Sequence, residues 1–485
     1  MLILTGCAAA PSATPSGESL PTATSSPSES AVPSVSQPSY LPPTGTWIGF
    51  RWPIRDVELA STGAIYVSEW DLGETASAIH RLNANGQESP GWPIETEGAP
   101  DLLMDGTSLM AGVCTTGPTP GPCQLHRFRE DGTEAQGFPV RLPAGCFNMQ
   151  LAWNTAIVLE CYDDDDARLV AVDRTGHLLN GWPKRLRGFS SSGIAADGLV
   201  YALSRPTREE QRIDVFELNG GEPPGWPVHM PLTGNAFGIS GLQPHPTGFL
   251  MVWGLEGVVP DQICLEADRT SVTVLASDGR VMPDWPIQMD GVGSRPAVAS
   301  SGASWLRAGG EQHRIAGFDA QGRPMDGWPI EVPADACLPS GPASVSLLED
   351  GARVALVESS TISLWTPDGS VIPGWPLTVD GRLAGGCQPS PCMPGGNGAI
   401  APVVTHRDSA MYLVTYAGDR PETMQAQVVA FDTDGQLVLG FPLPIPELPC
   451  YPDVCPFAAP QVIDVQLTID ERVVVIASEG LFIVQ

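Results

Sequence analysis

Positive charge is scarce in this sequence. The chain has 485 residues, of which 25 are lysine or arginine and 55 are aspartate or glutamate, and its single lysine is Lys184. The resulting net charge of −30 repels phosphate backbones, so we expect no nucleic-acid partner. Acidic residues in such excess keep a large protein soluble.

Long hydrophobic runs and helical periodicity are also lacking. No stretch of about 18 apolar residues could span a membrane as a helix. No apolar stripe with 3.6-residue spacing continues over three turns. Glycine (53 residues) and proline (49 residues) are abundant, whereas charged residues make up only 16%. This composition favours a turn-rich, all-β protein.

Short catalytic motifs are missing as well. The sequence contains no G-x-S-x-G, H-E-x-x-H, P-loop or dinucleotide-binding glycine motif. The histidines are scattered rather than clustered, at His80, His126, His177, His229, His245, His313 and His406. We therefore predict no catalytic residues, no metal ligands and no cofactor from short motifs.

The N-terminal segment resembles a bacterial lipoprotein signal. Leu4-Thr5-Gly6-Cys7 is similar to a lipobox, which implies lipidation of Cys7. Only six residues precede Cys7, too few for a full signal, so residues 1–7 are interpreted as a truncated one and we expect a start codon upstream. Residues 8–44 are rich in Ser, Pro and Thr and are predicted to be a disordered tether to a globule at 45–485. The expected location is extracytoplasmic, with attachment to the membrane by the lipid alone.

A sequence motif with fixed internal spacing recurs along residues 45–485. A turn glycine is followed six residues later by an aromatic residue and then by proline, which is typical of a repeat array. Eight such pairs occur, Gly86/Trp92, Gly132/Phe138, Gly176/Trp182, Gly220/Trp226, Gly279/Trp285, Gly322/Trp328, Gly369/Trp375 and Gly435/Phe441. We predict that these aromatic residues are structural and are buried between neighbouring units.

Each unit of about 44 residues reads as four antiparallel strands, A to D. Sequences such as Asp-Arg-Thr-Gly are typical of the C–D hairpin. The fourth strand is predicted to end at the Trp-Pro and to form an edge, because proline cannot donate to a ladder. Four-stranded units in radial array indicate a single β-propeller. The Gly-Trp-Pro endings resemble bacterial quinoprotein-like and FG-GAP-type propellers.

The two ends of the chain complement each other. A ninth Trp-Pro, at Trp52, lacks the partner glycine, and the C-terminal unit lacks a fourth strand. We expect the N-terminal strand to complete the last blade and close the ring. The motif count predicts nine blades, with eight as the alternative if one irregular unit is not a blade.

The connections fall into two classes on opposite faces. A–B and C–D turns are short, whereas B–C and D–A loops are long, as in 114–123, 162–168, 255–270 and 385–398. Insertions on one face usually mark a binding face. Both chain ends are expected on the short-turn face. The run Asp163, Asp164, Asp165 and Asp166 is interpreted as a solvated loop tip on the other face, and calcium binding stays open as its alternative.

Ten cysteines after Cys7 lie in or beside the long loops. An even number in an exported protein predicts disulfides. Sequence proximity favours Cys114–Cys123, Cys387–Cys392 and Cys450–Cys455, followed by Cys146–Cys161, which leaves Cys264 and Cys337. A metal site is the alternative, but these spacings differ from those of zinc ligands.

These features predict a binding scaffold rather than an enzyme. The expected protein is a monomeric lipoprotein that binds a protein or a glycan at the cell envelope through its loop-rich face. One alternative is a dehydrogenase dependent on pyrroloquinoline quinone, although in those proteins the tryptophan lies closer to the turn glycine. The other is a glycan-cleaving propeller, which needs two carboxylates about 5–10 Å apart.

Overall fold

The computed structural model describes most of residues 44–484, and in these residues all regular structure is β-strand. No helix there is long and apolar enough to cross a membrane. The description excludes residues 1–43, 72–75, 116–120, 153–154, 164–165, 195–197, 208–209, 232–237, 257–267, 294, 310–312, 333–344, 348–353, 358–360, 380–381, 384–404, 408–409, 418–424, 447–461, 471, 478–479 and 485.

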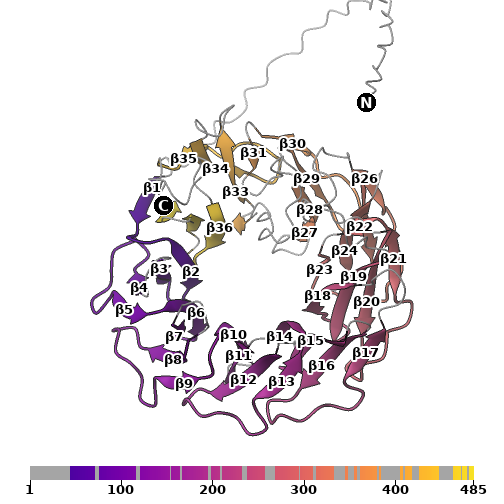
Figure 1. Ribbon diagram of the computed structural model, residues 1–485. Coiled ribbons are helices and arrows are strands. Elements are labelled where there is room, and N and C mark those ends of the chain that lie inside the picture. The colour runs from indigo at the N-terminus through magenta and orange to yellow at the C-terminus, as the bar shows by residue number, and fades with distance from the viewer. Residues whose placement is uncertain are drawn as a thin grey trace, which may run out of the picture. The chain divides into compact units, whose positions relative to one another are not determined.

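Nine antiparallel sheets form a ring, so the fold is an all-β propeller with nine blades (Figure 1). The prediction of nine blades is confirmed, and eight is excluded. Seven sheets have four strands, and the first strand is divided into two pieces in the sixth and eighth blades.

The blades follow one another along the chain. Blades 1 to 3 comprise β2 (Ile54–Leu59), β3 (Ile65–Trp70), β4 (Ala76–Leu82), β5 (Ile94–Glu97); β6 (Ala99–Asp105), β7 (Ser108–Cys114), β8 (Cys123–Phe128), β9 (Val140–Leu142); β10 (Cys146–Ala152), β11 (Ala156–Asp163), β12 (Asp166–Asp173), β13 (Lys184–Arg187). Blades 4 to 6 comprise β14 (Phe189–Ile194), β15 (Val200–Thr207), β16 (Glu210–Phe216), β17 (Val228–Pro231); β18 (Gly238–Pro244), β19 (Leu250–Glu256), β20 (Arg269–Leu275), β21 (Ile287–Asp290); β22 (Val292–Gly293), β23 (Ala297–Val298), β24 (Ser304–Gly309), β25 (His313–Phe318), β26 (Ile330–Val332). Blades 7 to 9 comprise β27 (Val345–Leu347), β28 (Val354–Val357), β29 (Thr361–Trp365), β30 (Leu377–Thr378); β31 (Arg382–Leu383), β32 (Thr405–Arg407), β33 (Ala410–Ala417), β34 (Gln425–Phe431), β35 (Leu443–Pro444); β36 (Val462–Leu467), β37 (Val473–Ala477), β38 (Gly480–Val484), β1 (Gly45–Gly49).

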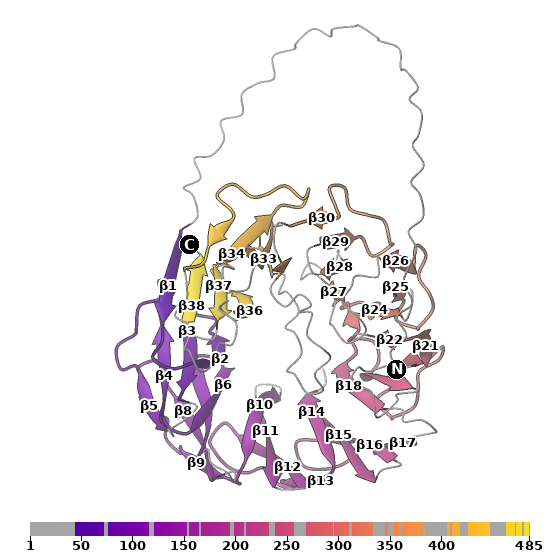
Figure 2. The same cartoon turned by 45° about the horizontal axis from the view of Figure 1, so that its top comes forward.

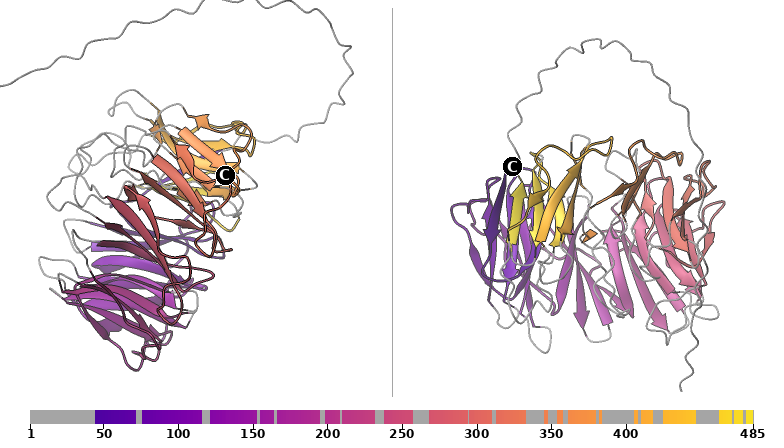
Figure 3. Two further views of the ribbon diagram at one scale, coloured as in Figure 1. Left: turned by 90° about the vertical axis from the view of Figure 1, so that its right-hand side faces the viewer. Right: turned by 90° about the horizontal axis from the view of Figure 1, so that it is seen from above.

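The first strand of each blade lies on the inner side of the ring, and the fourth lies outside (Figure 1). The edge-on views of Figure 3 show the strands running between the two faces of the ring. Since each blade is antiparallel, its A–B and C–D connections lie on one face, here called the short-turn face. Its B–C and D–A connections lie on the opposite face, here called the loop face. The prediction that the D–A loops are long is wrong at Gly98, Gly188 and Gly291, each of which is the single residue between two blades.

The predicted end of the fourth strand is wrong. In blade 1 the strand β5 begins at Ile94, directly after Trp92-Pro93, and pairs with β4. The aromatic-Pro segment therefore belongs to the C–D connection and precedes the fourth strand in blades 1 to 8. Its aromatic residue packs toward the seam with the next blade. The short strand after the proline forms the outer edge of the blade, which suits proline because it has no N–H to donate to a further strand.

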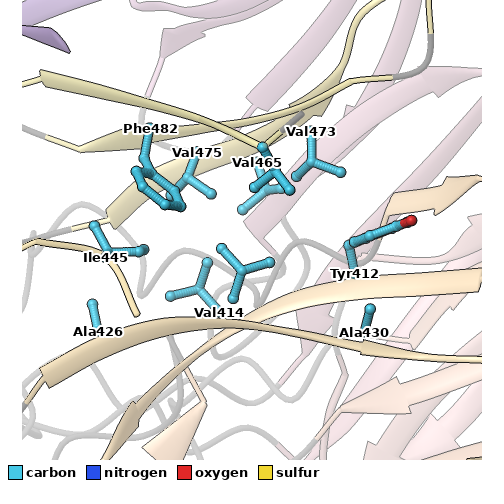
Figure 4. Packing of buried hydrophobic residues seen from close by; sticks show 11 residues of the cluster. Tyr412, Val414, Ala426, Ala430, Ile445, Val465, Val473, Val475 and Phe482 are labelled. Carbon is cyan, nitrogen blue, oxygen red and sulfur yellow. The ribbon is translucent and has the colours of Figure 1, made fainter. Parts of the chain in front are cut away.

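Nine hydrophobic clusters fill the nine seams between adjacent blades. Figure 4 shows one of them, in which Val414 of β33 faces Val475 and Phe482 of blade 9. The middle strands are buried on both faces, so they read as continuous apolar runs such as Val473–Ala477. Burial in these seams is the main source of stability of the ring.

Five of the repeat tryptophans fasten their blade to the next one by a hydrogen bond. In blade 1, Trp92 lies within the cluster shared with blade 2, and its indole nitrogen donates to the carbonyl of Glu130, 3.1 Å away in the next C–D turn. The glycine before it, Gly91, has a φ of 87°, and a Cβ there would lie 2.3 Å from the carbonyl oxygen of Asp131. Only glycine allows this approach of two backbones. The same indole–carbonyl hydrogen bond is made by Trp182, Trp226, Trp328 and Trp375.

The prediction that all motif aromatics are buried is wrong for the two phenylalanines. Phe138 and Phe441 are only half-buried and pack at the margin of their seam clusters. A phenyl ring is smaller than an indole and has no N–H group to donate to the next turn, so no hydrogen bond draws it further into the seam. Phe441 instead contacts Tyr412 edge to face, with 5.8 Å between ring centroids. Burial is confirmed for the tryptophans of blades 1 and 3 to 7, which are Trp92, Trp182, Trp226, Trp285, Trp328 and Trp375.

The N-terminal strand completes blade 9, as predicted. β1 pairs with β38 in antiparallel register, with Gly45 opposite Val484 (Figure 2). The start of β1 and the end of β38 therefore both lie at the short-turn face. The seam between blades 9 and 1 is closed by apolar residues of both blades, including Ile65 and Ile483.

Trp52 differs from the other Trp-Pro residues. It is half-buried, and it follows the fourth strand β1 and precedes β2, so it lies in the D–A connection on the loop face. The prediction that Trp52 is a ninth member of the structural motif is therefore wrong, because the C–D connection of blade 9 is replaced by the two chain ends.

Candidate functional site

A group of aromatic, basic and polar side chains lies at the loop-face end of blades 1 to 3. We call it the loop-end group. Arg55 is the second residue of β2, and Asp101 is the third residue of β6, so both lie near the loop-face start of an innermost strand. Trp70 is the last residue of β3 and reaches the same face. The remaining members are Arg51, Trp52 and Asn148.

An ion pair joins the first two blades within this group. Arg55 donates from Nη2 and Nε to Oδ1 of Asp101, at 2.7 and 3.0 Å. The backbone N–H of Asn148, on the first strand of blade 3, donates to Oδ2 of the same carboxylate at 3.3 Å. Both carboxylate oxygens are therefore engaged, and three innermost strands are linked through one side chain.

Asn148 has an unusual backbone. Its φ is 52°, in the left-handed region, and it lies where the register of β10 and β11 shifts between Phe147 and Gln150. Such a conformation is uncommon for a residue other than glycine, although asparagine tolerates it best. The bulge directs the N–H of Asn148 at Asp101 while the residue itself stays exposed.

The group contains two half-buried indole rings, of which Trp70 lies at the ion pair. The guanidinium of Arg55 lies 5.6 Å from the ring centroid of Trp70, and that of Arg51 lies 4.4 Å from the ring of Trp52. These are cation–π distances. The main chain that carries both rings is held in place, since the backbone N–H of Trp70 donates to the carbonyl of Pro53 at 3.1 Å and that of Trp52 donates to Glu69 at 2.8 Å.

Two disulfides brace the same end of blades 2 and 3. Cys114–Cys123 joins the end of β7 to the start of β8, and Cys146–Cys161 joins β10 to β11. The blades are also linked to each other, because Cys146 N–H donates to Cys123 Sγ at 3.1 Å. These are two of the predicted pairs. The other six cysteines, Cys264, Cys337, Cys387, Cys392, Cys450 and Cys455, lie outside the described residues, as does Cys7.

The aspartate run does not form a long loop. β11 extends to Asp163 and β12 begins at Asp166, with the two residues paired, so only Asp164 and Asp165 lie between the strands. The expectation of an irregular loop over 162–168 is therefore wrong, because the strands of this blade continue almost to the tip. Among the described residues, no group of three or more His, Cys, Asp or Glu side chains could hold a metal ion.

Two further carboxyls lie on the innermost strand of blade 1. Burial and the neighbouring charge of Asp56 raise the pKa of Glu58 to about 7. Burial also raises the pKa of Asp56, although the N–H of Leu102 donates to its carboxylate at 2.8 Å. A carboxyl that is partly protonated near neutral pH can act as a proton donor.

His80 and His126 occupy the same repeat position for a structural reason. Each ring bonds through Nδ1 to a glutamate two residues after the turn glycine, His80 to Glu88 at 2.9 Å and His126 to Glu134 at 2.8 Å. The histidines are therefore not brought together into one site, which agrees with their separate positions in the repeat.

Sequence reasoning singled out the loop face but missed Arg55, Trp70, Asp101 and Asn148. Each is an isolated residue within a strand, at positions 55, 70, 101 and 148. Arg55 and Asp101 are charged residues within strands, but Trp70 and Asn148 carry no charge and belong to no motif. The meaning of all four depends on which strands are neighbours in the ring.

Comparisons with known proteins give similar folds at low identity. No sequence-family model and no curated protein sequence matches the chain. Among solved structures, a eukaryotic initiation factor is similar at a TM-score of 0.47, with 11% identity, over 81% of this chain and 88% of that one. The Dos1 propeller is similar at 0.43, with 9% identity, over 78% and 90%. The WD40 domain of SCAP from fission yeast is similar at 0.42, with 8% identity, over 91% and 98%. The fold assignment rests on the strand order of this chain.

Proposed function

We propose that this protein is an envelope lipoprotein, anchored through lipid at Cys7, whose propeller binds a protein or a glycan through its loop face. Binding, rather than catalysis, is its main role. The tether of residues 8–44 would enter the ring at Gly45, whose partner Val484 lies at the short-turn face. A lipid anchor on that side would leave the loop face directed away from the membrane.

The observation that carries this proposal is the difference between the two faces. On the short-turn face the repeated turns are used for structure, since their carbonyls accept from tryptophans of the preceding blade. On the loop face, blades 1 to 3 present half-buried aromatic and exposed charged side chains on a base held by two disulfides. A rigid base that presents such side chains is the usual construction of a binding surface.

Blocking one face at a time tests this function. An azide-bearing phenylalanine is introduced at Ala144, in the loop-face connection before β10, and in a matched variant at Gln321, in a short-turn-face hairpin; both residues are exposed. Each variant of residues 45–485 is coupled to a bulky polymer and incubated with envelope fragments. We expect retention of the Gln321 conjugate and loss of retention of the Ala144 conjugate. Equal retention of both conjugates would show that the loop face does not bind.

The anchor requires a separate test. The gene is expressed with its upstream codons, and the protein is located after cell fractionation. We expect the wild type in the membrane fraction and Cys7→Ser in the soluble fraction. A Cys7→Ser protein that remains in the membrane would contradict lipidation.

A glycan-cleaving activity is the second candidate, and Glu58 favours it. Its pKa of about 7 and its neighbour Asp56 provide a protonated acid beside a second carboxyl, which glycoside hydrolysis requires. Release of reducing ends from envelope glycans by the wild type, and its loss in Glu58→Gln, would establish this activity. Absence of release over pH 5–8 would leave binding as the function.

A further inference from the structure

We propose that the loop-end group is a binding site for an uncharged carbohydrate. This inference rests on the proposed function and specifies its ligand. The group combines three properties that restrict the chemistry of a ligand: half-buried indole rings, an ion pair without net charge, and an exposed amide.

The ion pair argues against an ionic ligand. Arg55 bonds to Asp101 through two nitrogens, so its charge is balanced within the site. The whole chain carries a net charge of −30, which repels polyanions such as uronate or phosphate polymers at long range. A cation would have to displace Arg55 from Asp101, whose oxygens both already accept hydrogen bonds. Arg51, the other cation of the group, lies over the ring of Trp52, and the negative field of the whole chain opposes the approach of an anion, so a neutral molecule suits the site best.

The polar groups argue against a purely apolar ligand. The side chains of Arg55 and Asp101 are 33% and 20% exposed, and covering them with hydrocarbon would remove their water without replacing its hydrogen bonds. A ligand that covers them must offer hydroxyl or amide groups in return. The guanidinium has five N–H donors, of which two bond to Asp101, and the exposed Asn148 side chain carries both donors and an acceptor.

The indole rings define the shape of the ligand. Trp70 and Trp52 are half-buried, their backbone N–H groups are bonded, and a guanidinium lies over each ring, so the rings are already partly ordered before binding. The part of each indole that the guanidinium of Arg55 or Arg51 leaves uncovered can accommodate a flat apolar surface, while the polar groups around it accommodate polar edges. A pyranose has C–H groups on its faces and hydroxyls around its rim, and it satisfies both requirements without charge.

Calorimetric titration of residues 45–485 tests the inference. The probes are β-1,4-linked hexasaccharides of glucose, mannose and N-acetylglucosamine, with hexagalacturonate as the anionic counterpart of the same size. We expect at least one neutral probe to bind and hexagalacturonate to bind at least tenfold more weakly. Failure of all three neutral probes, or preference for hexagalacturonate, would overturn the inference.

Variants locate the binding. Trp70→Ala removes a ring face, and Asp101→Asn removes a charged hydrogen-bond partner. Each is expected to weaken binding of the neutral probe about tenfold. Trp70→Phe retains an aromatic face and should weaken binding less than Trp70→Ala. Arg323→Ala, which removes an exposed ion pair with Asp319 on the short-turn face, is the control and should bind as the wild type. Binding that is unchanged in Trp70→Ala would also overturn the inference.

The two proposals fail in different ways. If envelope fragments retain the protein through its loop face but no neutral probe binds, the scaffold function stands and the carbohydrate assignment is wrong. If neither envelope fragments nor probes bind, both are wrong. Circular dichroism and the melting temperature of Trp70→Ala and Trp70→Phe show whether a loss of binding comes from the site or from unfolding.

Discussion

The indole nitrogen of Trp285 has no hydrogen-bond partner among the described residues, and the residue before it, Asp284, stands where the other blades have glycine. Asp284 has a φ of 64°, in the left-handed region. Its Cβ hinders the close approach that Gly91 makes in blade 1. The indole of Trp285 instead lies against Gly322, where a Cβ would be 2.9 Å from the ring. The seam between blades 5 and 6 thus lacks the hydrogen bond that fastens other blades.

Replacing Asp284 with glycine should strengthen this seam. Asp284→Gly removes the cost of a side chain at positive φ and allows the backbones to approach, so that Trp285 can reach the carbonyl two residues before Gly322. Glycine has greater conformational entropy than aspartate in the unfolded state, which offsets part of this gain. We expect a net stabilisation of about 1 kcal/mol. Chemical denaturation measures this difference. The matched reverse variant, Gly327→Asp, should destabilise, because a Cβ at Gly327 would lie 2.0 Å from the carbonyl oxygen of Asp368.

The closing strand is held by two aromatic–glycine contacts. Trp47 and Phe482 are paired across β1 and β38, and each ring covers the position where a Cβ would stand on the partner strand, at Gly480 and Gly45 respectively. Gly480→Val should therefore displace Trp47, loosen β1 and destabilise the ring by about 1–3 kcal/mol. Thermal unfolding measures the effect. Gly106→Val is the control, since nothing lies within 4 Å of a Cβ there, although its positive φ adds a cost of its own.

Removal of β1 as a whole is a stronger version of the same test. A chain beginning at residue 50 leaves β38 as an unpaired edge and exposes part of the seam between blades 9 and 1. We expect aggregation and a lower melting temperature, measured by light scattering and calorimetry. A truncated protein that melts as the full chain does would show that closure by β1 contributes little.

Glu58 makes stability depend on pH. Its pKa is raised from the ordinary 4.5 to about 7, so the folded state binds this proton more tightly than the unfolded state does. The stabilisation that comes from this tighter proton binding is fully present below pH 4.5 and is lost as pH rises through 7. Glu58→Gln should therefore match the wild type near pH 4.5 and exceed its stability at pH 8. Because Glu58 is partly exposed, solvent screening limits the difference to about 1–2 kcal/mol.

Denaturation at pH 4.5, 6 and 8 measures this difference, and Glu95→Gln on β5 is the control because Glu95 is exposed. The control should change stability little and without a step near pH 7. A wild type that is as stable at pH 8 as Glu58→Gln would contradict the raised pKa.

His80 is a base and not an acid, but its pKa is also raised in the folded state, so its contribution to stability also falls as pH rises. Burial lowers the pKa of His80, yet the hydrogen bonds to Glu69 and Glu88 outweigh burial and raise it above 6.5. Because each ring nitrogen faces a carboxylate, the charged imidazolium is the favoured form. Its contribution is complete below pH 6.5 and disappears as pH rises through the raised pKa. Since Glu69 also holds Trp52, this contact supports the junction between β1 and β2.

His80→Gln should therefore destabilise by about 1–2 kcal/mol at pH 5.5 and by much less at pH 9. His126→Gln is the matched variant, as it occupies the same repeat position with one glutamate partner. Denaturation at the two pH values measures both. An effect of His80→Gln that is equal at pH 5.5 and pH 9 would contradict a charged His80 held between Glu69 and Glu88.

The amino-acid sequence by itself determined the repeat, the number of blades, the closure by the N-terminal strand and two disulfide pairs. Each of these depends on residues that recur at fixed spacing, such as Gly86 and Trp92, or that lie close along the chain, such as Cys114 and Cys123. Local spacing carries this information because each blade is a local unit of the chain.

Only the tertiary structure decided where the fourth strands begin, how Trp52, Phe138 and Phe441 differ from the buried tryptophans, and which side chains meet on the loop face. Arg55 and Asp101 are 46 residues apart in sequence and adjacent in space, since the ring brings successive innermost strands together. No spacing rule reveals such a site, because its members belong to different repeats and each one alone looks like an ordinary strand residue. Contacts between repeats depend on the curvature of the ring, which arises from the packing of all nine seams.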